Sequence, residues 1–182
     1  MADTNTKINI TIGLDQVKFG TASPAGVMPG SMTKIGMVYQ NTANLSQDTA
    51  EVTEHFEEGK AVPFYRKKTK KAPVLTFSLV VDDLNQLVKT VGGSLITDEQ
   101  GNVIGWGFNG DELANDAAVL AITKQGLDIE IPNGDIDAVC NEDIGGDGVF
   151  MVSVTVTPKS VDEGKKAFRR VKKATASPAS QE

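Results

Sequence analysis

The sequence predicts a mainly β fold, in which two packed antiparallel sheets form a sandwich or barrel and one α-helix lies on their flank. Several short segments alternate apolar and polar side chains with a period of two, which is typical of half-buried strands. Turn residues rather than long helices separate these segments, so the strands are expected to pair antiparallel. With 182 residues, of which 40% are hydrophobic, the chain can bury one core of ordinary size.

The first half of the chain is predicted to hold strands joined by polar loops. Alternating apolar residues predict strands over residues 7–14, 34–41 and 48–58, the last with one polar face. Residues 20–33 are rich in Gly, Pro, Ser and Thr, which indicates a loop. Residues 59–73 are expected to form a second loop, which is basic.

A well-defined strand and the single helix come next. Residues 74–81, VLTFSLVV, are dominated by β-branched and aromatic side chains, which favour a strand. A helix is predicted over residues 82–91, because Asp82 can cap its start and apolar residues then recur at helical spacing. Gly92 and Gly93 are expected to end this helix.

The second half of the chain returns to short strands. Residues 117–124 fit either a strand or a helix, and we favour the strand because another strand follows at hairpin distance. Asn133–Gly134 is a strong turn signal, and the acidic residues 135–148 are expected to continue as a turn with a Gly-rich end. The other predicted strands of this half span residues 94–97, 103–108, 127–131 and 149–157.

The formal net charge of −6 is divided into blocks. Residues 59–73 carry six basic and no acidic side chains, whereas residues 74–158 carry two basic and fourteen acidic ones. Residues 159–182 are basic again, and they are predicted to form a flexible tail behind a β domain of residues 1–158. One interpretation is a solvated loop and a solvated tail. The other is self-association, in which basic segments of one copy meet acidic faces of another.

Catalytic motifs are missing from the sequence, so neither enzymatic activity nor a cofactor is expected. One Cys and one His cannot build a tetrahedral Cys/His zinc site, and a catalytic Ser–His or Cys–His pair would have to use His55. The acidic pair Asp135 and Asp137 lacks the central Gly and the closing Glu of a calcium-binding loop. Trp106, between two glycines, is predicted to anchor a strand in the core, with ligand stacking as the alternative.

Two binding functions compete with a structural one. Arg66–Lys71, preceded by two aromatic residues, and Lys165–Lys173 could neutralise nucleic-acid phosphates. Trp106 could serve a carbohydrate-binding β module. No apolar run approaches the ~20 residues of a membrane span and the first residues lack an apolar signal core, so a protein made in the cytoplasm without a membrane partner is expected.

The segment GVMPGSMTKIGMVYQNTANLSQDTAEVTEHFEEG, from Gly26 to Gly59, resembles the major tail tube proteins of phages, especially of phages that infect Bacteroides-type hosts. IPNGDIDA and the closing VFMVSVTVTPK add to this likeness. The resemblance implies a virion protein of the phage tail, made in the host cytoplasm, whose hexameric rings stack head to tail. It also implies a tube with an acidic lumen through which double-stranded DNA passes at ejection without tight binding, and contacts with other tail proteins. Another head–tail structural protein is the closest alternative.

The resemblance implies functions for two sets of residues, one in contact between rings and one in the wall of the lumen. The basic segment is the candidate for contact between rings, through Arg66, Lys67, Lys68, Lys70 and Lys71. The candidates for the lumen wall are Glu51 and His55 on one strand face, and Asp128 and Glu130 on another. No catalytic, cofactor-binding or metal-binding residue is expected.

Overall fold

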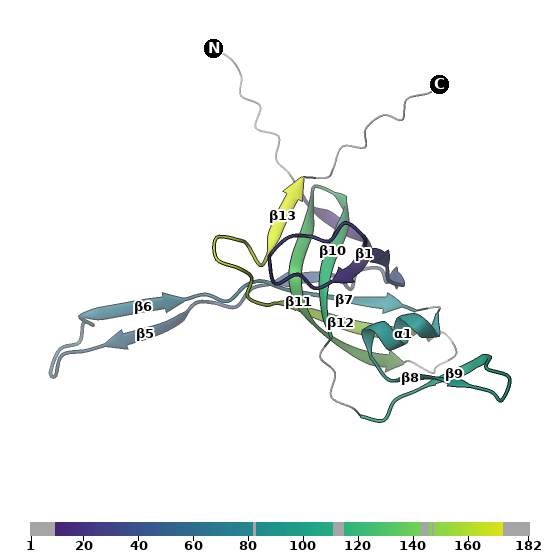
Figure 1. Ribbon diagram of the computed structural model, residues 1–182. Helices are drawn as coiled ribbons and strands as arrows, with labels where there is room; N and C mark the ends of the chain where they lie inside the picture. Colours follow the sequence, from purple (N-terminus) through teal and green to yellow (C-terminus); the bar gives the residue numbers. More distant parts are fainter. Residues whose placement is uncertain (1–9, 82, 111–114, 143–145, 147, 173–182) are drawn as a thin grey trace, which may run out of the picture.

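The computed structural model describes residues 10–81, 83–110, 115–142, 146 and 148–172, and it confirms a mainly β, antiparallel fold with one helix (Figure 1). A curled nine-stranded sheet has the order β2-β1-β10-β11-β12-β7-β3, with β13 paired to β11 and β4 paired to β7. Its strands are β1 (Ile12–Thr21), β2 (Thr33–Lys34), β3 (Met37–Val38), β4 (Asn44–Ser46), β7 (Val74–Val80), β10 (Asp116–Gln125), β11 (Leu127–Glu142), β12 (Phe150–Pro158) and β13 (Arg169–Lys172). The pairs β5 (Glu51–His55) with β6 (Tyr65–Thr69) and β8 (Ser94–Thr97) with β9 (Val103–Gly107) form two separate hairpins.

The core lies inside the curl of the main sheet. The predicted strand at 74–81 is confirmed as β7, and its side chains alternate strictly between half-buried and buried positions. β12 alternates in the same way, so both strands turn one face toward the core. Each fully buried aliphatic or aromatic side chain contributes about 1.5–3 kcal/mol. The most deeply buried members are Val17, Ile35, Phe77, Leu79, Val119, Ile131, Val152, Val154 and Val156.

Residues 33–38 draw the two ends of the main sheet together. Lys34 pairs with β1, and Met37 pairs with Val80 of β7 only three residues later. Between them, the backbone N–H of Ile35 donates to the carbonyl of Val17 (3.1 Å), and the Ile35 side chain is buried. The predicted strand over 34–41 is therefore wrong in form, because this segment bridges two edges as short pieces instead of running along one strand.

Helix α1 (Leu84–Thr90) confirms the predicted helix over its central residues. Its cap is Asp83, whose carboxylate accepts a hydrogen bond from the backbone N–H of Asn85 (2.9 Å); the predicted cap, Asp82, lies outside the described residues. Leu87 and Thr90 are the buried positions of the helix. Gly92 takes a φ of 90° directly after the helix, a left-handed conformation that suits glycine and stops the helix as expected.

Strand β11 is longer than predicted and passes through the expected turn at Asn133–Gly134. A register shift in the β10–β11 pairing, between Ala117 and Val119, absorbs the extra residues as a bulge. Asn133 is buried there, and its side-chain amide donates to the carbonyl of Ser160 (2.8 Å). A Cβ at Gly134 would lie 3.2 Å from the carbonyl oxygen of Ala117, so glycine allows two strands to approach closely. The Asn–Gly pair thus serves packing, and the turn prediction is wrong.

Residues 159–172 of the predicted flexible tail are docked on the main sheet, so the prediction is corrected for this part of the segment. The N–H of Lys159 donates to the carbonyl of Asn133, and the N–H of Asp162 donates to that of Pro24. β13 then pairs with the first four residues of β11. The basic strand is held because it adds to an acidic one, as the Arg169–Glu130 ion pair (3.1 Å) illustrates. The remaining tail residues, 173–182, lie outside the described part of the chain.

The first predicted strand is displaced. It was expected over residues 7–14, whereas β1 begins at Ile12 and continues to Thr21. Residues 1–9 lie outside the described residues. The alternating pattern up to Leu14 therefore overlaps only the start of the strand, and the most buried position, Val17, lies beyond it.

Candidate assembly surfaces

The basic segment predicted as a loop is half of a projecting hairpin. β6 (Tyr65–Thr69) pairs antiparallel with β5 (Glu51–His55), and all the residues of both strands are exposed. Figure 1 shows this hairpin extending far from the main sheet. The loop prediction for residues 59–73 is therefore corrected to a turn followed by a strand.

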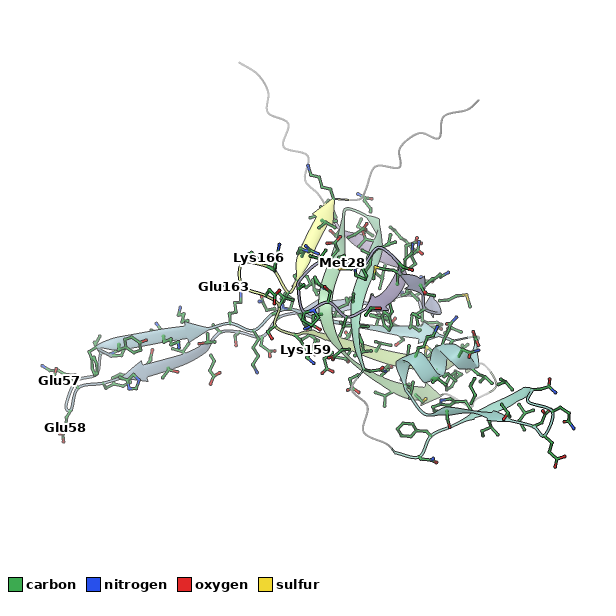
Figure 2. The ribbon with its side chains drawn as sticks, viewed as in Figure 1. Met28, Glu57, Glu58, Lys159, Glu163 and Lys166 are labelled. Carbon is green, nitrogen blue, oxygen red and sulfur yellow. The ribbon has the colours of Figure 1, made fainter. Side chains whose placement is uncertain are left out.

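The hairpin partly neutralises its own charge. Glu54 lies opposite Arg66, and the guanidinium Nε is 2.9 Å from the carboxylate. Glu57 and Glu58 lie at the far tip (Figure 2). Between residues 51 and 71, four glutamates offset part of the six positive charges and leave a net +2. The predicted contact residues Arg66, Lys67, Lys68, Lys70 and Lys71 are all exposed on this hairpin or directly after it.

Apolar side chains on the hairpin face solvent. Val62 and Phe64 are 76% and 73% exposed, and Val52, Phe56 and Tyr65 are also exposed. Within the described residues no third strand pairs with the hairpin. A two-stranded ribbon of this kind is marginally stable in water, because it has no second layer on which to bury its faces. The hairpin therefore offers an exposed apolar surface that could bind another molecule.

The four predicted lumen residues lie in two different environments. Glu51 and His55 lie on one face of the projecting hairpin, where the His55 ring is 5.7 Å from that of Tyr65. Asp128 is buried and accepts hydrogen bonds from the backbone N–H (2.8 Å) and the hydroxyl (3.2 Å) of Thr123. Its carboxylate fixes the β10–β11 turn, so its assignment to a solvent-filled lumen is wrong. Glu130 forms an ion pair with Arg169.

An acidic face that the sequence reasoning missed lies on β11 and its neighbours. Asp135 and Asp137 are exposed on the side of β11 opposite the core, whereas Ile136 between them is buried. The pairing register continues this face across β12 and β7, and its hydroxyl-bearing members are Thr155, Thr157, Ser153, Thr76 and Ser78. The signal was the alternation Asp–Ile–Asp, which is the pattern of a half-buried strand but was interpreted as a turn.

A lysine closes one end of this acidic face. Asp116 lies opposite Asp135 in the β10–β11 register, so two carboxylates meet across the strands. The Lys159 ammonium approaches the Asp116 carboxylate to 2.7 Å. This hydrogen bond raises the pKa of Lys159 above its ordinary value. Asp135 and Asp137 form no ion pair within the described residues.

Strands β11, β12, β7 and β4 form a four-stranded antiparallel layer with two different open edges. Residues 137–142 of β11 pair with β12 on one side, and no described strand pairs with their other side. At the opposite end, β4 pairs with β7 alone. Unpaired edges such as β4 and residues 137–142 of β11 favour addition of further strands. A cavity of about 210 Å³ lies between β4 and β1, and Leu14, Leu45 and Ile129 are among the residues that line it.

The second hairpin, β8–β9, is also apolar on its exposed side. Trp106 anchors it as predicted, because its ring is half-buried against the core and its indole N–H donates to the carbonyl of Gly92 (2.7 Å). This hydrogen bond fixes the indole ring at the start of the hairpin. At the hairpin turn, hydrogen bonds from Asn102 hold the pKa of Asp98 below its usual value. The exposed apolar residues are Ile96, Val103, Ile104 and Phe108.

Comparison with family models and with curated proteins finds no match for this chain. The described part of the chain contains no helix that is both long and apolar enough to cross a membrane. It also contains no group of three or more His, Cys, Asp or Glu side chains placed to hold a metal ion. The fold, the open edges and the exposed hairpins are therefore the observations from which function can be argued.

Proposed function

We propose that this protein is a structural subunit that assembles into stacked rings, as the tail tube of a phage. The observation that carries the proposal is the four-stranded layer with two different open edges, β4 and residues 137–142 of β11. The sequence resemblance to tail tube proteins supports the same function independently of this geometry.

Joining the two edges gives a ring. β4 runs antiparallel to β7, and the alternation continues through β12 to β11, so β11 of a second copy can pair antiparallel with β4. Each junction satisfies backbone N–H and C=O groups that otherwise face solvent. Because the two edges are different surfaces, the contact is heterologous, and repetition closes a ring when the rotation between copies divides a full turn. The curl of the sheet supplies this rotation.

The acidic, hydroxyl-bearing face of the same layer fits the wall of a conduit. Asp135 and Asp137 of every copy would be repeated around the ring and repel phosphate groups. β7 and β12 contain no charged residue, so this face has no cation among their side chains to retain DNA. We assign the lumen wall to this face, in place of Asp128 and Glu130.

Electron microscopy and hydrogen exchange test this proposal together. Negatively stained protein at high concentration is expected to show rings or hollow tubes. Backbone amides of residues 137–142 that point away from β12 are expected to exchange quickly in the monomer and slowly in the assembly. Amides in the middle of β12 are the internal control, because strands pair with both sides of β12 within one chain.

Three results contradict the proposal in different ways. A monomer at every concentration, with residues 137–142 always unprotected, refutes the ring. Rings in which these amides stay unprotected refute the proposed edge pairing alone. Tight binding of duplex DNA at physiological salt, weakening steeply as salt rises, favours the nucleic-acid-binding alternative.

A further inference from the structure

The two hairpins leave the molecule from opposite ends of β7. The β5–β6 hairpin is inserted between β4 and β7, and it returns to the sheet just before Val74. α1 and then the β8–β9 hairpin follow the other end of the strand, after Val80. Figure 1 shows them extending in different directions, so they cannot meet within one chain. Two copies that stack end to end would bring them together.

The β5–β6 hairpin offers apolar side chains beside positive charge. Phe64 and Val62 are the most exposed large apolar residues of the chain's described part. Lys67 and Lys68 follow on β6 and form no ion pair among the described residues, where the ion pair of this hairpin is Glu54–Arg66. Two such hairpins facing each other would oppose like charges. The complementary surface is therefore apolar and acidic.

The β8–β9 hairpin has this complementary character. Its turn carries Asp98 and Glu99 and no basic residue, and Ile104 on β9 is 64% exposed. Gly105 and Gly107 also flatten its outer side. A Cβ at either glycine would meet only the Ile96 side chain, at 3.7 and 3.4 Å, and neither has a positive φ, so the chain itself does not require glycine there. Glycines of this kind allow another backbone to approach closely.

We infer that the β5–β6 hairpin of one copy binds the β8–β9 hairpin of the next copy and forms the axial contact of the assembly. This inference rests on the proposed stacking of copies and identifies the receiving surface. The contact buries Phe64 and Val62 against Ile104 and Ile96, and it places Lys67 and Lys68 near Glu99. The two hairpins are different surfaces, so a pair of copies joined by one contact still has a free β5–β6 hairpin at one end and a free β8–β9 hairpin at the other. Further copies can therefore add at both ends, and the stack grows without limit.

Two single substitutions, each disabling one partner surface, test the inference. Phe64→Asp disables the contact surface of the β5–β6 hairpin and leaves that of the β8–β9 hairpin intact. Ile104→Asp does the reverse. Each is expected to weaken axial association by about 30-fold or more, the effect of losing a central interface residue. Val27→Asp is the matched control, because Val27 is 56% exposed but lies on neither hairpin. Sedimentation velocity and side views in the electron microscope measure the number of layers.

Mixing the two variants gives the decisive result. Each alone is expected to stop at a single layer, and the mixture is expected to form two-layer particles and nothing longer, because each pair has one intact contact. Normal stacks from either variant alone, or no pairing in the mixture, overturn the inference. Circular dichroism and thermal melting confirm folding. Should Ile104→Asp unfold its hairpin, Glu99→Lys, expected to weaken stacking most at low salt, takes its place.

These outcomes separate this contact from the proposed ring. If rings form but both variants stack normally, the hairpin contact is refuted and the ring remains. If the wild-type protein forms linear stacks without rings and the mixture forms pairs, the hairpin contact holds and the ring is refuted.

Discussion

Truncation of the chain after Pro158 is expected to destabilise the whole sheet. The deleted segment includes residues 159–172, which return across the molecule and end in β13 on the edge of β11. Asn133 depends on this segment twice. Its side-chain amide donates to the carbonyl of Ser160, and its own carbonyl accepts from the N–H of Lys159, both at 2.8 Å. The truncation removes both partners of a buried residue.

The size of the effect follows from these contacts. A buried polar group that loses its partner costs about 1–3 kcal/mol, and Asn133 has two such groups. Phe168 packs against the core, and half-burial of a phenyl ring contributes about 1 kcal/mol. The Arg169–Glu130 pair is partly exposed, so it adds at most about 1 kcal/mol. A total of about 3–8 kcal/mol is a large part of the 5–15 kcal/mol that typically stabilises a domain.

Urea denaturation followed by tryptophan fluorescence measures this loss. With a slope of about 2 kcal/mol per molar urea, the midpoint is expected to fall by about 1.5–4 M. Truncation after Lys172 is the control, because it keeps every contact described here and is expected to leave the midpoint unchanged. If truncation after Pro158 shifts the midpoint no more than the control does, the docked segment contributes nothing and the reasoning is refuted.

Two further predictions concern the close approach in β11 and the acidic face. Gly134→Ala is expected to lower the free energy of unfolding, measured by urea denaturation, by about 1–3 kcal/mol, because the new methyl group meets two neighbouring strands. Gly30→Ala is the control and is expected to change this free energy little, because no atom lies within 4 Å of the new methyl group. Equal effects of the two substitutions contradict the prediction. After assembly, the double variant Asp135→Lys/Asp137→Lys is expected to retain labelled duplex DNA at low salt. The control is Glu163→Lys, on the exposed loop before β13 (Figure 2). If the control retains as much DNA as the double variant, the lumen assignment is contradicted.

The strands with a clear alternating pattern could be predicted from the sequence. β7, β12 and the short helix α1 each carry their signal within a few residues: alternation in the strands, and apolar spacing followed by two glycines in the helix. Residues 117–124 were resolved correctly as a strand because a partner followed at hairpin distance. These are local signals, and the core they build confirmed the predicted fold class.

Long-range contacts explain what could not be predicted. β13 has no alternation of its own and is a strand because β11, about forty residues earlier in the chain, offers an edge of opposite charge. Asn133–Gly134 has the composition of a turn, yet the Asn133 side chain binds the carbonyl of Ser160, and Gly134 allows the neighbouring strands to pack closely. The lumen candidate Asp128 is misplaced for the same reason: a turn buries it, and its carboxylate accepts hydrogen bonds from Thr123.

The docking of β13 on β11 also determines when the fold can be completed during synthesis. β10, β11 and β12 emerge from the ribosome before β13, so they can pair while the edge of β11 at Leu127–Glu130 is still open. β13 is the last of the described strands to be translated, and it fills this edge only when residues 169–172 have left the exit tunnel. A nascent chain therefore keeps an unpaired, acidic strand edge until residues 169–172 leave the exit tunnel, and a chain terminated before these residues retains that edge as a site for chaperones and proteases.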